Sequence, residues 1–376
     1  MRVAICGYPP LALQVQESLK NSDIEFKFFI RDFVPFRGAE EDNLSTNLPQ
    51  INFFEFRWLV NKGELDGIII ADKARSDFTK ACVQTCKLYG ISKIGIADFI
   101  NINPFNPVYM LDPSKIYVGY LETNIADACN LNCRGCTHFS GLFERDEIYP
   151  LENFRRDVSK LSQTCDIVRF RLLGGEPLLL KNIDEYIKIS RQYLPKTNLR
   201  LVTNGLLIPS LSQKVLDAIR KNNCIVDISS YKITVQIIDK VKNILTSNNI
   251  LFQLNDFVKD KFGVFLTLHS GNNPEKSRAV CFNNECRFLR DGKIYKCPID
   301  ALNYKFTEKF GIENFPAATA VDIYTPNFSA LLEHLNGNVE MCYWCSEKCR
   351  KIDWEPTNNP KLEDWLAAPD ELQNFQ

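Results

Sequence analysis

The first hundred residues alternate between short apolar runs and segments whose apolar positions repeat with helical spacing. The apolar runs occupy residues 2–8, 24–30, 65–72 and 93–99, and the helical spacing covers residues 11–21, 53–63 and 77–90. Strands separated by helices of this length predict a parallel sheet with right-handed crossovers. We therefore expect a small Rossmann-like domain over residues 1–110, ending in a proline-containing linker over residues 101–114.

The same alternation restarts at residue 115 and continues to residue 272. Strands are predicted at residues 116–124, 166–173, 199–205, 224–230, 250–255 and 263–268, and helices at residues 151–163, 182–194, 212–222 and 235–245. This alternation predicts a full or partial β/α barrel over residues 115–272. In such folds the reactive groups gather at the carboxyl ends of the strands.

Beyond residue 272 the pattern changes to short strands, loops and cysteines. Asp291 and Gly292 separate two extended runs, which is the usual signal for a tight hairpin. We expect residues 273–376 to form a third, cysteine-rich domain. The fold class predicted for the whole chain is α/β.

Composition and charge narrow the possible functions. The 376 residues contain 45 Lys and Arg against 46 Asp and Glu, for a net charge of −1, and no basic block, which disfavours a nucleic-acid partner. No apolar stretch has the ~18 residues of a spanning helix, and the first residues lack a secretory signal. We expect a cytoplasmic protein without a membrane partner. In that reducing compartment, 14 cysteines beside 3 histidines favour metal or redox chemistry over disulfides.

The first cysteine cluster follows a predicted strand directly. Cys129, Cys133 and Cys136 have CxxxCxxC spacing, so three thiolates can bind three irons of a [4Fe-4S] cluster and leave the fourth iron open. An open coordination position is what a catalytic metal site needs. A zinc site is the alternative, with His138 as the nearby candidate for a fourth ligand.

The order of motifs after these cysteines resembles the radical S-adenosylmethionine (SAM) family. The matching residues are Gly174, Gly175, Glu176 and Pro177 after one strand, Thr203, Asn204 and Gly205 after the next, and Ser229 after another. The resemblance implies that the glycines let the backbone approach the methionyl part of SAM, and that Glu176 accepts hydrogen bonds from its ammonium group. It also implies that Ser229 meets the ribose.

Three further residues near these motifs are considered under the same resemblance. Gly135 stands where many family members carry an aromatic residue beside the adenine, so it supplies only backbone there. His138 and Ser230 are candidates to face the substrate. Packing of the cysteine loop is an equally good explanation for His138.

The tail resembles the auxiliary-cluster segment of radical SAM enzymes with a twitch or SPASM extension. Its six cysteines are Cys281, Cys286, Cys297, Cys342, Cys345 and Cys349. Four thiolates saturate a [4Fe-4S] cluster, so we expect four of the six to hold one auxiliary cluster. Structural zinc is the alternative. The remaining cysteines, Cys6, Cys82, Cys86, Cys165 and Cys224, fall in predicted strands and helices and are expected in the core.

The resemblance implies that an electron from a flavodoxin or ferredoxin reaches the first cluster. SAM is then cleaved to methionine and a 5'-deoxyadenosyl radical, which abstracts hydrogen from a substrate carbon. The auxiliary cluster would take up the substrate electron, as in dehydrogenation, or relay electrons. Epimerisation would instead need a hydrogen-atom donor, for which Cys165, Cys224 or a spare tail cysteine could serve only if it reaches the pocket.

For the substrate, the Rossmann-like N-terminal domain differs from the winged-helix leader-binding domain that peptide-modifying relatives often carry. Residues 65–99 look similar to segments of enzymes that modify nucleotide sugars and polysaccharides. We therefore favour a sugar or sugar-nucleotide substrate, with peptide modification as the alternative. A non-catalytic iron-sulfur or zinc scaffold is a hypothesis of another class.

Overall fold

The computed structural model describes residues 1–31, 47–98, 104–254, 258 and 260–368. The chain groups into two compact units, each built from several segments. Unit 1 comprises Met1–Tyr120, Ser162–Arg169 and Lys196–Asn198, and unit 2 comprises Leu121–Leu161, Phe170–Pro195 and Leu199–Gln376. Within the described ranges, no helix has the length and apolar character needed to cross a membrane. The three-domain division stays a prediction.

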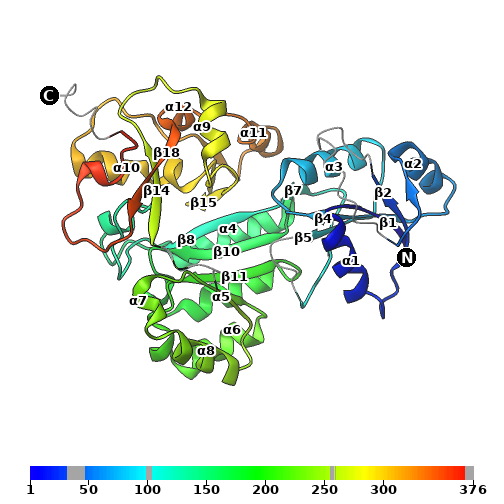
Figure 1. The fold of residues 1–376 in the computed structure, drawn as a ribbon, viewed down its shortest axis with the longest axis horizontal. Coiled ribbons are helices and arrows are strands. Elements are labelled where there is room, and N and C mark those ends of the chain that lie inside the picture. The colour runs from blue at the N-terminus through cyan, green and yellow to red at the C-terminus, as the bar shows by residue number, and fades with distance from the viewer. Residues whose placement is uncertain (32–46, 99–103, 255–257, 259, 369–376) are drawn as a thin grey trace. The chain divides into compact units, whose positions relative to one another are not determined.

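Unit 1 contains a six-stranded sheet in the order β3-β2-β1-β4-β5-β6. Figure 1 labels four of these strands, β1, β2, β4 and β5. Its strands are β1 (Arg2–Gly7), β2 (Glu25–Ile30), β3 (Gln50–Ile51), β4 (Gly67–Asp72), β5 (Ile94–Asp98) and β6 (Tyr109–Met110). All neighbours pair in parallel except β6, which runs antiparallel to β5. The predicted parallel sheet is confirmed, and β6 is a strand inside the expected linker.

Helices cover both faces of this sheet because alternate residues of a strand point to opposite sides. The helices are α1 (Pro9–Ser18), α2 (Phe53–Asn61) and α3 (Asp77–Leu88). Leu11 and Val15 of α1 pack on the face that carries Ile69. Helices α2 and α3 pack on the other face, where Cys82 and Cys86 are fully buried in the core. Packing thus accounts for this cysteine pair.

Unit 2 contains an eight-stranded sheet in the order β13-β12-β11-β10-β8-β15-β16-β17. Its strands are β8 (Leu121–Ala126), β10 (Arg169–Gly174), β11 (Asn198–Thr203), β12 (Ile225–Ile228), β13 (Phe252–Leu254), β15 (Phe288–Arg290), β16 (Lys293–Tyr295) and β17 (Ala320–Asp322). Strand β8 is parallel to both neighbours, β10 and β15. Among the described residues this sheet does not close on itself, so the core is a partial barrel.

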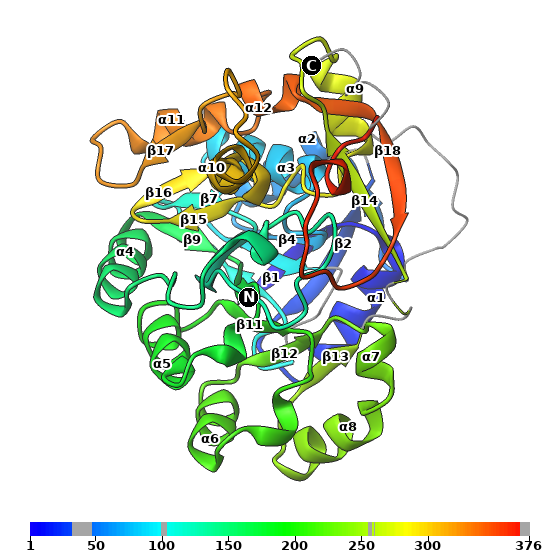
Figure 2. The same ribbon diagram turned by 90° about the vertical axis from the view of Figure 1, so that its left-hand side faces the viewer.

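Helices connect the parallel strands and lie along the outside of the sheet (Figure 2). They are α4 (Leu151–Thr164), α5 (Ile183–Tyr193), α6 (Gln213–Lys221), α7 (Lys232–Val235) and α8 (Ile238–Ser247). Short 3-10 turns occur at η1 (Ser140–Leu142), η2 (Pro177–Leu179), η3 (Ile208–Ser210) and η4 (Leu362–Asp364). The strand-to-helix connections at the carboxyl ends of the strands hold the predicted site motifs.

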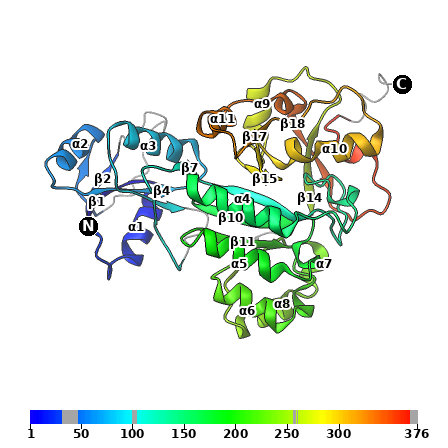
Figure 3. The ribbon, with the colours of Figure 1, turned by 180° about the vertical axis from the view of Figure 1, so that it is seen from behind.

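Three predicted barrel strands differ from the structure. Residues 116–124 and 166–173 are each divided, because β7 (Ile116–Val118) and β9 (Cys165–Ile167) pair with each other in unit 1. Residues 263–268 fall largely in β14 (Lys261–Leu266), which pairs antiparallel with β18 (Cys345–Asp353) and takes no part in the parallel sheet (Figure 3). Apolar alternation is the same for both pairings, so the sequence pattern could not separate them.

The predicted hairpin at Asp291 and Gly292 is confirmed by the antiparallel pairing of β15 with β16. The other tail helices are α9 (Pro274–Val280), α10 (Pro298–Phe310), α11 (Phe328–His334) and α12 (Glu340–Tyr343). Because β15 pairs with β8, the hairpin extends the sheet that carries the first cysteine loop.

Candidate active site

The loop that carries Cys129, Cys133 and Cys136 follows the carboxyl end of β8. The three cysteines share one apolar cluster with Trp354 and Tyr231, and Cys133 is 8% exposed. Burial raises the pKa of the Cys129 thiol to about 12. The structure therefore brings the three predicted ligands together on one short, largely buried loop.

Each of these sulfurs has a polar neighbour that suits a thiolate. Leu131 donates its backbone N–H to Cys129 Sγ at 3.4 Å, and Trp354 donates its indole N–H to Cys133 Sγ at 3.0 Å. Cys136 Sγ lies 3.8 Å from the hydroxyl of Ser140. No three His, Cys, Asp or Glu side chains of the described chain converge on one metal position. A cluster does not need such convergence, because each thiolate binds a different iron.

Glu176 links the ends of two neighbouring strands beneath this loop. Its carboxylate is fully buried and accepts hydrogen bonds from Leu178 N at 3.0 Å, Thr203 Oγ1 at 2.8 Å and Asn204 N at 2.9 Å. Burial raises its pKa to about 7, while the three donors act in the opposite direction. Asn204 also donates to Asn130 Oδ1 at 2.7 Å, which ties β11 to the cysteine loop.

The two glycines before Glu176 are required by close packing against β8 and the residues that follow it. A Cβ on Gly174 would lie 1.8 Å from Ala126 O, and a Cβ on Gly175 would lie 2.1 Å from Ala128 O. Gly174 also has a φ of +155°. Pro177 then begins the short turn η2. Packing within the chain therefore requires glycine at both positions, whether or not a cofactor also lies against this backbone.

Gly135 also has no room for a side chain. Its φ is +63°, and a Cβ would lie 2.6 Å from Val264 and 2.8 Å from the backbone oxygen of Asp364. Ser229 lies at the end of β12, where its N–H donates to Thr203 O at 2.9 Å, and Ser230 follows it, buried. The structure thus places the Thr203 and Ser229 motifs side by side.

His138 contacts β8 rather than the cysteine sulfurs. Its Nδ1 lies 2.9 Å from Asn124 Oδ1, its Nε2 lies 4.0 Å from Glu122 Oε1, and its ring packs against Phe288. These contacts agree with packing of the loop, and no zinc role for His138 gains support from them.

A segment that sequence reasoning missed lies along the cysteine loop. Trp365 donates its indole N–H to Cys136 O at 2.9 Å, and Thr357 N donates to Asn132 O at 2.9 Å. Arg134 Nε pairs with the buried carboxylate of Asp364 at 2.8 Å and with Glu355. We call residues 354–365 the C-terminal clasp. Its partners are more than 200 positions away, so no local pattern could reveal it.

The radical SAM superfamily matches this chain over residues 123–254, which include all three loop cysteines and the Glu176 network. Residues 123–254 form a radical SAM domain. This domain implies SAM and one [4Fe-4S] cluster as cofactors. The three thiols on one loop, each with a polar neighbour at its sulfur, fit that cluster.

Curated proteins resemble part of this chain. GTP 3',8-cyclase of Helicobacter pylori (strain ATCC 700392 / 26695) is 29% identical over 111 residues, covering 29% of this chain and 34% of that relative. GTP 3',8-cyclase of Sulfurovum sp. (strain NBC37-1) is 31% identical over 135 residues, covering 35% of this chain and 41% of that relative. The chain thus spans about a third to two fifths of the length of these curated relatives.

Two solved structures overlap this chain in part. The complex of BtrN with AdoMet and 2-DOIA has a TM-score of 0.36 and 16% identity, covering 66% of this chain and 98% of that chain. Native anSMEcpe with bound AdoMet has a TM-score of 0.30 and 19% identity, covering 36% of this chain and 42% of that chain. Neither overlap adds to the assignment of the radical SAM domain.

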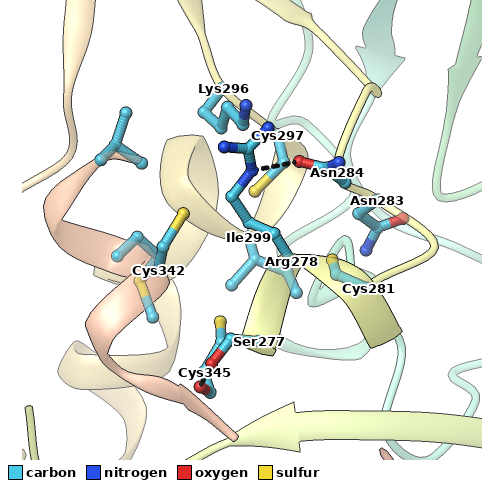
Figure 4. A pocket seen from close by; sticks show the side chains of 12 residues that line it. Ser277, Arg278, Cys281, Asn283, Asn284, Lys296, Cys297, Ile299, Cys342 and Cys345 are labelled. Carbon is cyan, nitrogen blue, oxygen red and sulfur yellow. Dashed lines mark hydrogen bonds between the residues drawn. The ribbon is translucent and has the colours of Figure 1, made fainter. Parts of the chain in front are cut away.

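Beyond the radical SAM domain, four of the six tail cysteines line one cavity. They are Cys281, Cys297, Cys342 and Cys345, and Figure 4 shows them on different sides of it. Burial raises the pKa of the Cys281 thiol to about 11, and it also raises the pKa values of the Cys297 and Cys345 thiols. Cys297 also begins helix α10, where its sulfur accepts the N–H of Asp300 at 3.4 Å.

The same cavity is lined by cations and by an unused donor. Lys296 is 4% exposed and donates to Leu335 O at 2.9 Å. Arg278 extends into the view of Figure 4, where its Nε donates to Asn284 Oδ1 at 2.8 Å. Within the described chain, the buried Nδ2 of Asn283 has no hydrogen-bond partner. Four thiols facing cations and a spare donor suit an anionic, thiolate-bound cluster.

The other two tail cysteines lie outside the lining of this cavity. Cys286 Sγ lies 3.8 Å from Phe282 O, and Cys349 Sγ lies 3.7 Å from Arg350 O. The five cysteines expected in the core are all buried, and Cys224 precedes the amino end of β12, the end opposite to Ser229.

Charged and polar side chains form a row across the parallel strands of unit 2. Glu122 of β8 is the register partner of Arg171 of β10, and Arg171 Nη2 lies 3.4 Å from Asp227 Oδ2 of β12. Arg200 bonds to Asp227 and, at 3.1 Å, to Gln253. The Arg171 and Asp227 side chains are 26% and 16% exposed and are accessible to polar groups, whereas those of Glu122 and Arg200 are buried.

Proposed function

We propose that this chain is a radical SAM enzyme that oxidises or epimerises a sugar or sugar-nucleotide at carbon, with oxidation favoured. The observation that carries the proposal is the convergence of the three-cysteine loop with the Glu176 and Asn204 network at the strand ends. An open iron site beside buried, ordered strand ends is suited to catalysis. A scaffold would gain nothing from it.

Cys129, Cys133 and Cys136 would hold the SAM-binding cluster, and Gly135, Glu176, Thr203, Asn204 and Ser229 would form the SAM site with Gly174, Gly175 and Pro177. Together, bound SAM and a reduced cluster supply reductive cleavage of SAM and abstraction of a substrate hydrogen atom. The chain's own contribution is to exclude water and orient the reactants. Glu176 contributes by fixing the ends of β10 and β11 at the mouth of the site.

Cys281, Cys297, Cys342 and Cys345 would hold the auxiliary [4Fe-4S] cluster. The positive charge of Lys296 near these cysteines would stabilise the cluster when it takes up an electron, because reduction adds negative charge. Neither Cys165 nor Cys224, the proposed hydrogen-atom donors, lies at the strand ends that carry the site. These two features favour oxidation over epimerisation. A flavodoxin- or ferredoxin-type protein would supply the electron for SAM cleavage.

A polar small molecule is the substrate class that these surroundings favour. The row from Glu122 to Gln253 offers hydrogen-bond donors and acceptors of both charges. The curated relatives are named for a nucleotide, GTP, which supports the sugar-nucleotide side of the proposal. No described feature of the site favours a peptide, which stays the alternative substrate.

The test is anaerobic reconstitution followed by incubation with SAM, a reductant and deuterated candidate substrates. We expect 5'-deoxyadenosine that carries deuterium from a sugar-nucleotide, and loss of SAM cleavage in Cys133→Ala. Cys82→Ala, which removes a buried thiol from the core of unit 1, is the control and should keep activity. Deuterium transfer from peptides alone would refute the substrate class. Bound zinc without SAM cleavage would favour the scaffold.

A further inference from the structure

The C-terminal clasp, residues 354–365, reaches the first cysteine loop at both ends. It begins directly after β18, whose first residue, Cys345, lines the auxiliary cavity. At its start Trp354 donates a hydrogen bond to Cys133, and at its end Trp365 donates a hydrogen bond to Cys136. Strand β18 therefore connects a tail cysteine to the clasp. The clasp in turn contacts the radical SAM loop through two indole N–H donors.

The two indoles bind different kinds of acceptor. Trp354 donates to the Cys133 sulfur at 3.0 Å, whereas Trp365 donates to the backbone oxygen of Cys136 at 2.9 Å. An indole N–H is a donor only and has no other hydrogen-bonding role. Of these two bonds, only the one from Trp354 acts on the sulfur of a predicted ligand. Substituting Trp354 therefore tests an electronic effect, and substituting Trp365 tests the effect of packing alone.

The Trp354 ring is held in place by stacking. Its centroid lies 5.0 Å from that of Tyr231 with an angle of 28° between the rings, and Trp354 is 8% exposed. Such an ordered, buried donor keeps its direction when the cysteine becomes a ligand. Water has little access to replace it.

We propose that Trp354 is a positioning residue that raises the reduction potential of the SAM-binding cluster by hydrogen bonding to Cys133. The proposal rests on the proposed function, because it requires a cluster at this loop. Reduction adds one negative charge to a thiolate-bound cluster, and a hydrogen bond to its sulfur stabilises the more negative state. The clasp thus sets how readily the cluster accepts its electron.

The test compares Trp354→Phe with Trp365→Phe in the full, reconstituted chain. The midpoint potential is measured by EPR-monitored titration, following the signal that changes when SAM is added. Losing this hydrogen bond should lower the ratio of reduced to oxidised cluster at a fixed potential about three- to tenfold in Trp354→Phe. A tenfold loss corresponds to 59 mV for one electron. Trp365→Phe should leave the midpoint unchanged.

Replacing Trp354 by β-(3-benzothienyl)alanine keeps the ring shape and removes only the N–H, so it tests the bond if Trp354→Phe fails to retain iron. It should lower the midpoint as the phenylalanine variant does. An unchanged midpoint, or an equal shift in Trp365→Phe, would overturn the proposal. A wild-type protein without any SAM-responsive signal would overturn the proposed function as well, which distinguishes the two failures.

Discussion

The tail cysteines give a sharp prediction about iron content. Cys281, Cys297, Cys342 and Cys345 line one cavity, so removing any one should cost the whole auxiliary cluster. With two [4Fe-4S] clusters the chain holds about eight irons, and Cys297→Ala should hold about four. Because Cys297 also caps α10, its loss should cost a further ~1 kcal/mol of stability.

The assay is iron and sulfide per chain after anaerobic reconstitution, alongside SAM cleavage and substrate turnover. Cys297→Ala should keep some SAM cleavage through the radical SAM loop while product formation is lost. Cys286→Ala and Cys349→Ala are matched controls, because their sulfurs face backbone oxygens outside the cavity lining. Equal iron loss in a control, or full iron and product in Cys297→Ala, would refute the assignment of ligands.

Three further predictions concern stability, measured by urea or thermal unfolding. Gly174→Ala should lower the free energy of unfolding by about 3 kcal/mol, because the methyl group would lie 1.8 Å from a backbone oxygen of β8. Gly141→Ala is the control and should be tolerated, because its methyl group would lie 3.5 Å from the nearest atom. Arg290→Met should lower the free energy of unfolding by about 3–5 kcal/mol, because buried Asp127 would lose the guanidinium that now lies 2.8 Å away. A smaller loss would contradict that pairing. Glu176 has its pKa raised from 4.5 to about 7, so the folded state holds the proton more tightly. Stability should therefore fall by about 3 kcal/mol as pH rises from 4.5 through 7, and Glu176→Gln should flatten that fall.

Strand-end motifs were predictable because their chemistry is local. The spacing of Cys129, Cys133 and Cys136 places three thiols on one loop whatever the rest of the chain does. Parallel strands also bring their carboxyl ends to one edge of a sheet, so the segments at Glu176 and Asn204 could be expected beside that loop. The turn at Asp291 and Gly292 follows from local backbone preference in the same way.

The sequence by itself thus determined the parallel α/β pattern, the order of the site motifs and the hairpin, because each depends on residues within a few positions of one another. Only the tertiary structure decided that β14 pairs with β18, that four particular tail cysteines share a cavity, and that Trp354 meets Cys133 across 221 positions. Such contacts depend on how whole elements pack, and apolar periodicity is the same for every packing partner. The three loop cysteines could therefore be predicted from their spacing, whereas the choice among the six tail cysteines and the residues that surround both groups depend on the fold.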